Sequence, residues 1–76
     1  MNQLIDGVRE GYWEEYYSNS NLQFKGNYIS GKLDGCWEEY YSNGKLWYKG
    51  NYKSGIKEGY WESYSNGKLE KQEIFI

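Results

Sequence analysis

The side chains of this 76-residue chain that could take part in chemistry are its glutamates, one cysteine and many aromatic rings. Histidine is absent and Cys36 is the one cysteine, so neither a nucleophilic triad nor a histidine-bound metal site is expected. Glu14 and Glu15 are adjacent, but neighbours on a strand point to opposite faces and cannot act as an acid–base pair. We therefore predict no catalytic residue, no metal ligand and no cofactor, and expect that the chain is not an enzyme.

One column of glutamates recurs every 24 residues, at Glu14, Glu38 and Glu62. Two strands would separate successive members by about 10 Å, which is too far for them to share a proton or a metal ion. The column is either a solvated acidic row or a strip that faces a partner. Cys36 stands where the other copies have Tyr12 and Tyr60, and we interpret it as a small hydrophobic substitute.

These residues belong to three tandem copies of one segment. Glycine, tryptophan and tyrosine columns keep the 24-residue period, and the tryptophans are Trp13, Trp37 and Trp61. Each copy is predicted to form a β-hairpin, as in strands near 11–17 and 22–28. We expect an all-β fold, an elongated, twisted antiparallel sheet of three stacked hairpins with six strands. The chain is one domain, 1–76, with repeats at approximately 6–30, 31–54 and 55–76.

The turn residues and the alternation of side chains predict the details of each hairpin. Asn43-Gly44 and Asn66-Gly67 favour type I′ turns, whereas Asn19-Ser20 is a weaker turn that should fray more easily.

Trp13 and Tyr16 are three residues apart, so either both faces carry aromatic rings or a bulge re-aims one ring. We expect the tryptophan column to form the core with the Leu22 and Tyr28 columns. The side that carries Tyr12 and Tyr16 should be the more exposed one.

Composition and charge exclude several function classes. Aromatic residues make up 21% of the chain, and the net charge is −2 with a pI near 5.1. Direct binding to nucleic acid needs a basic surface, and the acidic balance also disfavours a membrane surface. The start of the chain has no apolar segment typical of a secretion signal, so we expect a cytoplasmic protein.

The segment from Gly35 to Gly55, "GCWEEYYSNGKLWYKGNYKSG", resembles the variant class of MORN repeats, typified by G-x-W-x-x-Y-Y-x-N-G-x-L-x-x-x-x-x-Y-x-x-G. The resemblance extends from Asp6 to about Phe75 and implies an elongated, twisted sheet of stacked hairpins that serves as a scaffold or binding surface. Many bacterial proteins with such repeats carry the label of an antitoxin component. The chain departs from the pattern at Ser20, at Cys36, by a deletion after Tyr64 and in its last residues, "EKQEIFI".

The function that these observations favour is a module that binds and neutralises a partner protein with a basic surface. It would act as an antitoxin, or as a phage-type inhibitor of a nucleic-acid-processing toxin or defence enzyme. The alternative is a scaffold whose aromatic platforms bind carbohydrate, a cell wall or a membrane surface. The candidate partner-binding residues are Tyr12, Glu14, Tyr16, Glu38, Tyr40, Trp47, Tyr60, Glu62 and Tyr64.

A further expectation concerns self-association. The terminal "QEIFI" is apolar and β-prone, and an edge strand of this kind invites pairing. We therefore expect a homodimer or a partner-bound state.

Overall fold

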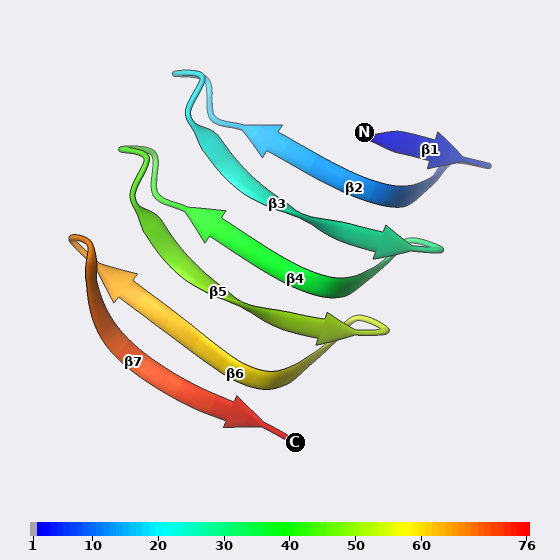
Figure 1. Ribbon diagram of the computed structural model, residues 1–76. Coiled ribbons are helices and arrows are strands. Elements are labelled where there is room, and N and C mark those ends of the chain that lie inside the picture. The colour runs from blue at the N-terminus through cyan, green and yellow to red at the C-terminus, as the bar shows by residue number, and fades with distance from the viewer. Residues whose placement is uncertain (1) are drawn as a thin grey trace.

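The computed structural model describes residues 2–76, so Met1, the first residue of the predicted domain, lies outside the described residues. The regular elements of residues 2–76 are seven strands that form one antiparallel sheet in sequence order (Figure 1). The sheet measures 39 × 36 × 12 Å along its principal axes, the thickness of a single layer. The predicted all-β fold of stacked hairpins is confirmed. The strands are β1 (Gln3–Ile5), β2 (Val8–Tyr16), β3 (Leu22–Ile29), β4 (Lys32–Tyr40), β5 (Leu46–Lys53), β6 (Ile56–Ser65) and β7 (Lys68–Phe75).

The sheet has one strand more than the six expected from the sequence. The short strand β1 pairs with the start of β2, from Gln3 opposite Glu10 to Ile5 opposite Val8. Its segment "NQLIDG" lies 24 residues before "GNYISG", so β1 corresponds to the second strand of a repeat. The 24-residue spacing of Gly7 and Gly31 was the signal that could have revealed it.

One of the two predicted type I′ turns is present in the structure, and the other has a different conformation. Asn66-Gly67 has positive φ at both residues, 53° and 79°, as a type I′ turn requires. At Asn43-Gly44 only Gly44 has a positive φ. Residues 41–45 connect β4 and β5; the Tyr41 N–H donates to the Lys45 carbonyl, and the Gly44 N–H donates to the Tyr41 carbonyl. The type I′ prediction at Asn43-Gly44 is therefore wrong. The extra residue Tyr41, which the third copy lacks, lengthens this loop.

The cross-strand register assigns the side chains to the two faces of the sheet. Trp13 lies opposite Gly26, and Trp37 lies opposite Gly50. Each hairpin then shifts register near its turn, between Glu15 and Tyr16 in the first copy. This bulge pairs each tyrosine with a leucine: Tyr16 with Leu22, Tyr40 with Leu46 and Tyr64 with Leu69.

The expected place of the leucine column in the core is consequently wrong. Residues directly opposite each other in an antiparallel pair point to the same face, so Leu22 lies with Tyr16 and away from Trp13. The inserted residue is Gln23, which has no partner in the register of β2 and β3. A one-residue bulge inverts the face of everything beyond it.

The core is a single layer of indole rings on one face of the sheet, here called the tryptophan face. Trp13, Trp37 and Trp61 are only 7%, 7% and 4% exposed. The ring of Trp37 lies on Gly26, where a Cβ atom would come within 2.5 Å of it, and Trp61 lies on Gly50 in the same way. A glycine in the preceding strand thus lets each of these two indoles approach the backbone closely.

The expected packing of the tryptophans with the Tyr28 column is confirmed. Tyr28 meets Trp13 edge-on at 6.0 Å between ring centroids, and Tyr52 meets Trp61 edge-on at 5.0 Å. Cations cover the outer side of two of the indoles. The Arg9 guanidinium lies 4.4 Å from the Trp13 ring, and the Lys57 ammonium lies 4.7 Å from the Trp61 ring.

Candidate interaction surface

Eight of the nine candidate partner-binding residues lie together on the face opposite the tryptophans, here called the tyrosine face. Tyr12, Glu14 and Tyr16 alternate with Trp13 and Glu15 along β2, and the same alternation recurs in β4 and β6. Three of its tyrosines are well exposed: Tyr12 at 37%, Tyr16 at 55% and Tyr60 at 64%. The expectation that this side is the more exposed one is confirmed.

A row of charged side chains crosses the middle of the tyrosine face. Successive cross-strand partners from β2 to β7 are Glu14, Lys25, Glu38, Lys49, Glu62 and Gln72. We call this set the charge row. Lys25 lies 3.2 Å from Glu38, and Lys49 lies 3.9 Å from Glu62. Sequence reasoning found the three glutamates but missed the two lysines between them.

The signal for those lysines was available in the repeat itself. Lys25 and Lys49 are 24 residues apart, in the matching segments "FKGNY" and "YKGNY". Placing them opposite the glutamates requires the hairpin register, and the bulge conceals this register in the sequence. The row therefore alternates in sign along most of its length.

Tyrosine hydroxyls hold the glutamates of this row in fixed positions. Tyr12 and Tyr16 both donate hydrogen bonds to the Glu14 carboxylate, at 2.7 and 2.6 Å. Tyr40 donates to Glu38 at 2.7 Å, and Tyr64 donates to Glu62 at 3.2 Å. A hydrogen bond from a phenol to a carboxylate is stronger than one between neutral groups, so these bonds order the phenol rings.

The hydrogen bonds and burial shift the pKa values of both partners. Hydrogen bonds from Tyr16 and Tyr12 hold the pKa of Glu14 below its usual range. Burial opposes ionisation of Glu38, but the bonds from Tyr40 and Lys25 lower its pKa nonetheless. Burial, together with the bond to Glu38, raises the pKa of Tyr40 to about 12. Glu14 and Glu38 are thus ionised, and the Tyr40 phenol is neutral, at physiological pH.

A shallow recess of about 300 Å³ opens in the tyrosine face beside Cys36. Cys36 is an exposed free thiol in the column that carries Tyr12 and Tyr60 in the other copies. Its small side chain leaves a space that a phenol ring would fill. The side chains that line the recess from this face are Cys36, Glu38, Lys49, Asn51, Tyr60 and Glu62.

Trp47 is the one candidate residue that the structure separates from the others. It is the inserted residue of the bulge in the second hairpin, equivalent to Gln23 in the first, and it stacks on Tyr41 at 5.1 Å between ring centroids. It also meets Tyr48 at 5.1 Å, and Tyr48 packs against the buried Trp61. Trp47 is 38% exposed and belongs to the aromatic cluster beside the turn, not to the tyrosine face.

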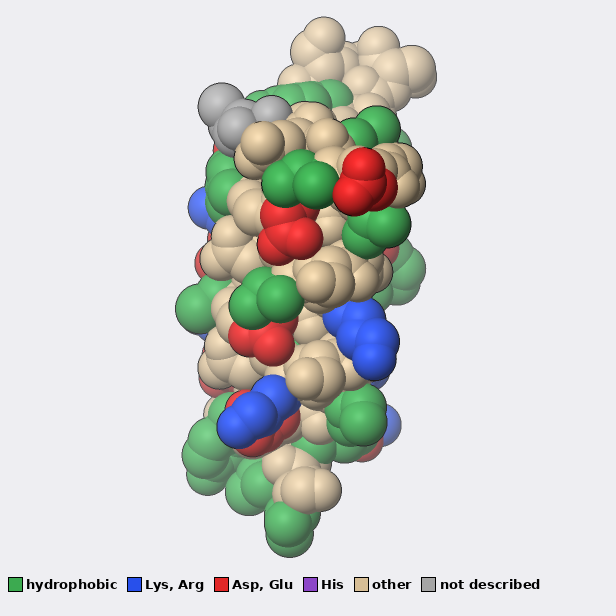
Figure 2. All heavy atoms as spheres, turned by 90° about the vertical axis from the view of Figure 1, so that its right-hand side faces the viewer, with side chains coloured by type: hydrophobic (Ala, Val, Ile, Leu, Met, Phe, Trp, Pro, Cys, Tyr) green, Lys and Arg blue, Asp and Glu red, His purple; other side chains and the backbone are tan. Residues whose placement is uncertain are grey.

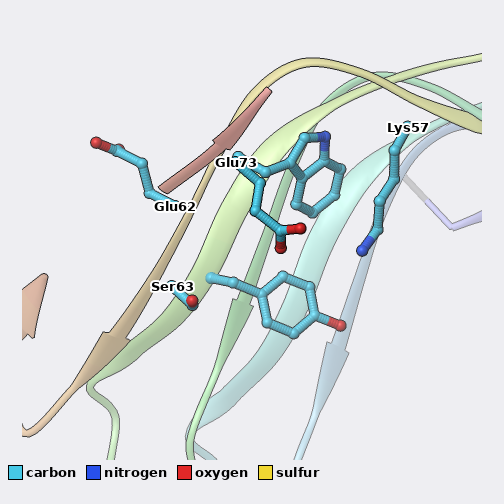
Figure 3. Close-up of a pocket in the computed structure, with 6 residues that line it drawn as sticks. Lys57, Glu62, Ser63 and Glu73 are labelled. Atoms are coloured by element: carbon cyan, nitrogen blue, oxygen red, sulfur yellow. The ribbon is translucent and has the colours of Figure 1, made fainter. Parts of the chain in front are cut away.

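The tryptophan face has a smaller recess, of about 140 Å³, beside Trp61. Figure 3 shows the Glu73 carboxylate and the Lys57 ammonium directed toward this space, while Glu62 points away from it. The Lys57 ammonium also lies 5.3 Å from the Phe75 ring. Lys57 thus covers the Trp61 ring, which is too deeply buried to serve as an open stacking platform for a sugar.

Within residues 2–76, no three acidic or cysteine side chains are grouped so that they could hold a metal ion. In the same part of the chain, no helix is long and apolar enough to cross a membrane.

Comparison with known proteins gives one match. A family model described as MORN repeat variant matches residues 9–30 and 33–54, together more than half of the chain. These segments contain the first two predicted repeats, and the hairpin of β6 and β7 follows them in the sheet. No curated protein and no solved structure matches the chain.

Proposed function

The chain belongs to the MORN repeat variant family, and from this premise we propose that it binds and neutralises a partner protein through its tyrosine face. Repeats of this family are non-catalytic modules that generally serve in binding. The proposal adds the kind of partner, the consequence of binding and the surface that is used.

The observation that carries the proposal is the set of tyrosines on this face, several of them ordered by glutamates, with Tyr60 exposed at the Cys36 recess. A tyrosine supplies a large contact area with few rotatable bonds, and here glutamates already fix several hydroxyls. A surface that is ordered before binding loses less conformational entropy when a partner docks. The recess could receive one side chain that protrudes from that partner.

The charges around the recess favour a lysine or arginine as that side chain. Glu38 and Glu62 border the recess on both sides of Lys49. The Lys49–Glu62 contact, at 3.9 Å, is long for an ion pair, so a guanidinium from a partner could take its place at Glu62. At the β2 end of the row, Glu14 is bonded to two tyrosine hydroxyls. A partner with a basic surface fits this arrangement.

Nucleic-acid-processing enzymes have basic surfaces because they bind phosphate backbones. We therefore propose that the partner is a toxin or a defence enzyme of this class, and that the chain is an antitoxin-like or phage-type inhibitor. Binding over the basic surface of such an enzyme would exclude its substrate without any chemical step. The site of action would be the cytoplasm, where these enzymes meet nucleic acid.

The experiment is affinity capture from the native host with three forms of the chain, followed by an assay of nuclease activity. The forms are the wild type, a tyrosine-face variant with Tyr40→Ala and Tyr60→Ala, and a control with Arg9→Lys on the tryptophan face. We expect a basic protein that the wild type and the control retain, that the double variant loses, and that is inhibited by the wild type.

Salt dependence tests the electrostatic part separately. Replacing Glu14, Glu38 and Glu62 by glutamine should weaken binding of the captured protein at low salt and flatten its dependence on salt. Unchanged affinity in the triple variant would remove the basic partner from the proposal. Glycan or lipid binding without any protein partner would favour the carbohydrate or membrane scaffold instead.

A further inference from the structure

The two edges of the described sheet are closed to different extents. At the first edge, β1 covers only residues Val8–Glu10 of β2. Beyond them, Asn2 occupies the edge: its main-chain N–H donates to the Tyr12 carbonyl at 2.9 Å. Its carboxamide donates to the Glu14 carbonyl and accepts from the Glu14 N–H, both at 2.8 Å. Asn2 thereby satisfies main-chain groups that a pairing strand would otherwise use.

The second edge, formed by β7, is longer. β7 pairs with β6 along its whole length, from Lys68 to Phe75, and lies at the end of the strand order within residues 2–76. Ile74 is 63% exposed on this strand, and Ile76 follows it fully exposed. Figure 2 shows hydrophobic side chains gathered at the lower end of the molecule, where Figure 1 places β7 and the C-terminus.

Glu73 prevents this edge from receiving another hairpin in the manner of the repeats. Trp37 lies on Gly26 of the preceding strand, and Trp61 lies on Gly50. The residue of β7 at the equivalent position is Glu73, directly opposite Trp61. A following tryptophan would meet its side chain, so a further hairpin cannot stack on β7 in the way that β4 and β6 stack on the strands before them.

We propose that β7 pairs with β7 of a second copy, antiparallel, about a two-fold axis that passes through Gln72. An isologous pairing of this kind uses one edge of each copy and closes the assembly at two. It leaves the first edge of each copy, with β1 and Asn2, at the outside.

The charges on β7 favour this register over the neighbouring symmetric registers. Opposed residues must point to the same face, so the symmetric registers near the middle of β7 place Lys71, Gln72 or Glu73 on the axis. With Lys71 or Glu73 on the axis, that residue lies opposite the same residue of the other copy, and two like charges opposite each other destabilise a sheet. With Gln72 on the axis, Lys71 of each copy lies opposite Glu73 of the other. The strand is self-complementary, since the axis generates two opposite-charge pairs.

The same register extends both faces of the sheet across the interface. Gln72 ends the charge row on the tyrosine face, opposite Glu62. A two-fold axis perpendicular to the sheet keeps each face on its own side, so the dimer has one continuous tyrosine face with two recesses. This arrangement does not depend on the identity of the partner or on whether the proposed inhibition is correct.

The test is a charge swap measured by sedimentation equilibrium. Lys71→Glu alone places two carboxylates opposite two carboxylates, and Glu73→Lys alone does the same with ammonium groups. The double variant, Lys71→Glu with Glu73→Lys, restores two opposite-charge pairs. We expect a wild-type dimer, a dissociation constant raised by about tenfold or more in each single variant, and recovery in the double variant.

Two controls separate association from folding. Lys71 and Glu73 also form an ion pair at 3.4 Å within one chain, so the melting temperature of each variant is measured alongside. Leu4→Lys changes an exposed side chain of the first edge and should leave the dimer intact. A wild-type chain that stays monomeric at high micromolar concentration would overturn the proposal. So would equal dissociation of the single and double variants, or a dimer lost in Leu4→Lys.

Discussion

At the scale of single residues, the fold depends on glycines that receive tryptophan rings. We predict that Gly50→Ala lowers the free energy of unfolding by about 1–3 kcal/mol, because the added methyl group would overlap the Trp61 ring. The ring can escape only by leaving the backbone and exposing part of its surface. Urea unfolding of the variant, followed by tryptophan fluorescence, measures the change.

Asn51→Ala is the matched control, since Asn51 is exposed and its side chain points to the tyrosine face. The main-chain carbonyl of Asn51, which accepts a bond from the Trp61 indole at 3.0 Å, is retained in that variant. Equal stability of the alanine variants at 50 and 51 would contradict the role of Gly50.

A second prediction at this scale concerns alkaline pH. The pKa values of Tyr12 and Tyr40 are raised from 10.0 to about 12 by burial and by their bonds to glutamates. A raised pKa in the folded state means that the stabilisation is complete below pH 10 and is lost as the pH rises through about 12. Urea unfolding at a series of alkaline pH values should show this loss.

Tyr40→Phe tests the assignment because it removes one of the hydroxyls. The variant should lose less stability than the wild type over the same alkaline range. If tyrosinate absorbance in the folded wild type rises entirely near pH 10, the hydrogen bonds to glutamate do not hold these phenols neutral.

At the scale of elements, we expect the turn between β2 and β3 to be the weakest of the three hairpin turns. Ser20 has a φ of +74°, a left-handed conformation that costs a residue with a Cβ about 1–2 kcal/mol. The second copy has Gly44 at the equivalent place, with a φ of +90°. We predict that Ser20→Gly stabilises the chain by about 1 kcal/mol, measured as a higher midpoint in urea.

Ser18→Gly provides the comparison within the same loop. Ser18 does not have a positive φ, so glycine there adds only flexibility to the unfolded chain and should be neutral or destabilising. Stabilisation by both substitutions, or by neither, would contradict the strain assigned to Ser20.

The elements also show what the sequence can predict and where it stops. Alternation and the 24-residue period predict the hairpins, the buried face and the exposed face, because side chains on a strand point alternately to opposite faces. They do not predict the bulge after Glu15, because one inserted residue leaves the composition of the strand unchanged. The leucine column was therefore assigned to the wrong face, and the lysines of the charge row were missed.

The sequence likewise predicts one part of the candidate site, the residues that share a strand, and misses the rest. Residues of one strand, such as Glu14 and Tyr16, share a face by alternation alone. Trp47 is instead the inserted residue of a bulge, so alternation does not give its direction, and contacts with Tyr41 and Tyr48 hold it beside the turn. The recess at Cys36 depends on what the neighbouring strands leave uncovered, which only the paired sheet shows.

At the scale of the whole molecule, the two faces of one thin sheet differ in what they contribute: one forms the core and the other is exposed. The tryptophan face supplies the core, with three indoles covered by neighbouring rings and cations. The tyrosine face is ordered by hydrogen bonds but remains largely open to solvent. Because a single layer has no opposing sheet to cover this second face, we assign it to the partner.

The most direct test of this assignment is the rate at which the Cys36 thiol reacts with a maleimide in the presence of the captured partner. Cys36 is the one cysteine of the chain, is exposed, and lies in the recess of the tyrosine face. The account predicts that the rate falls in proportion to the fraction of chain bound. An unchanged rate in a saturated complex would show that the partner docks elsewhere and would contradict the account.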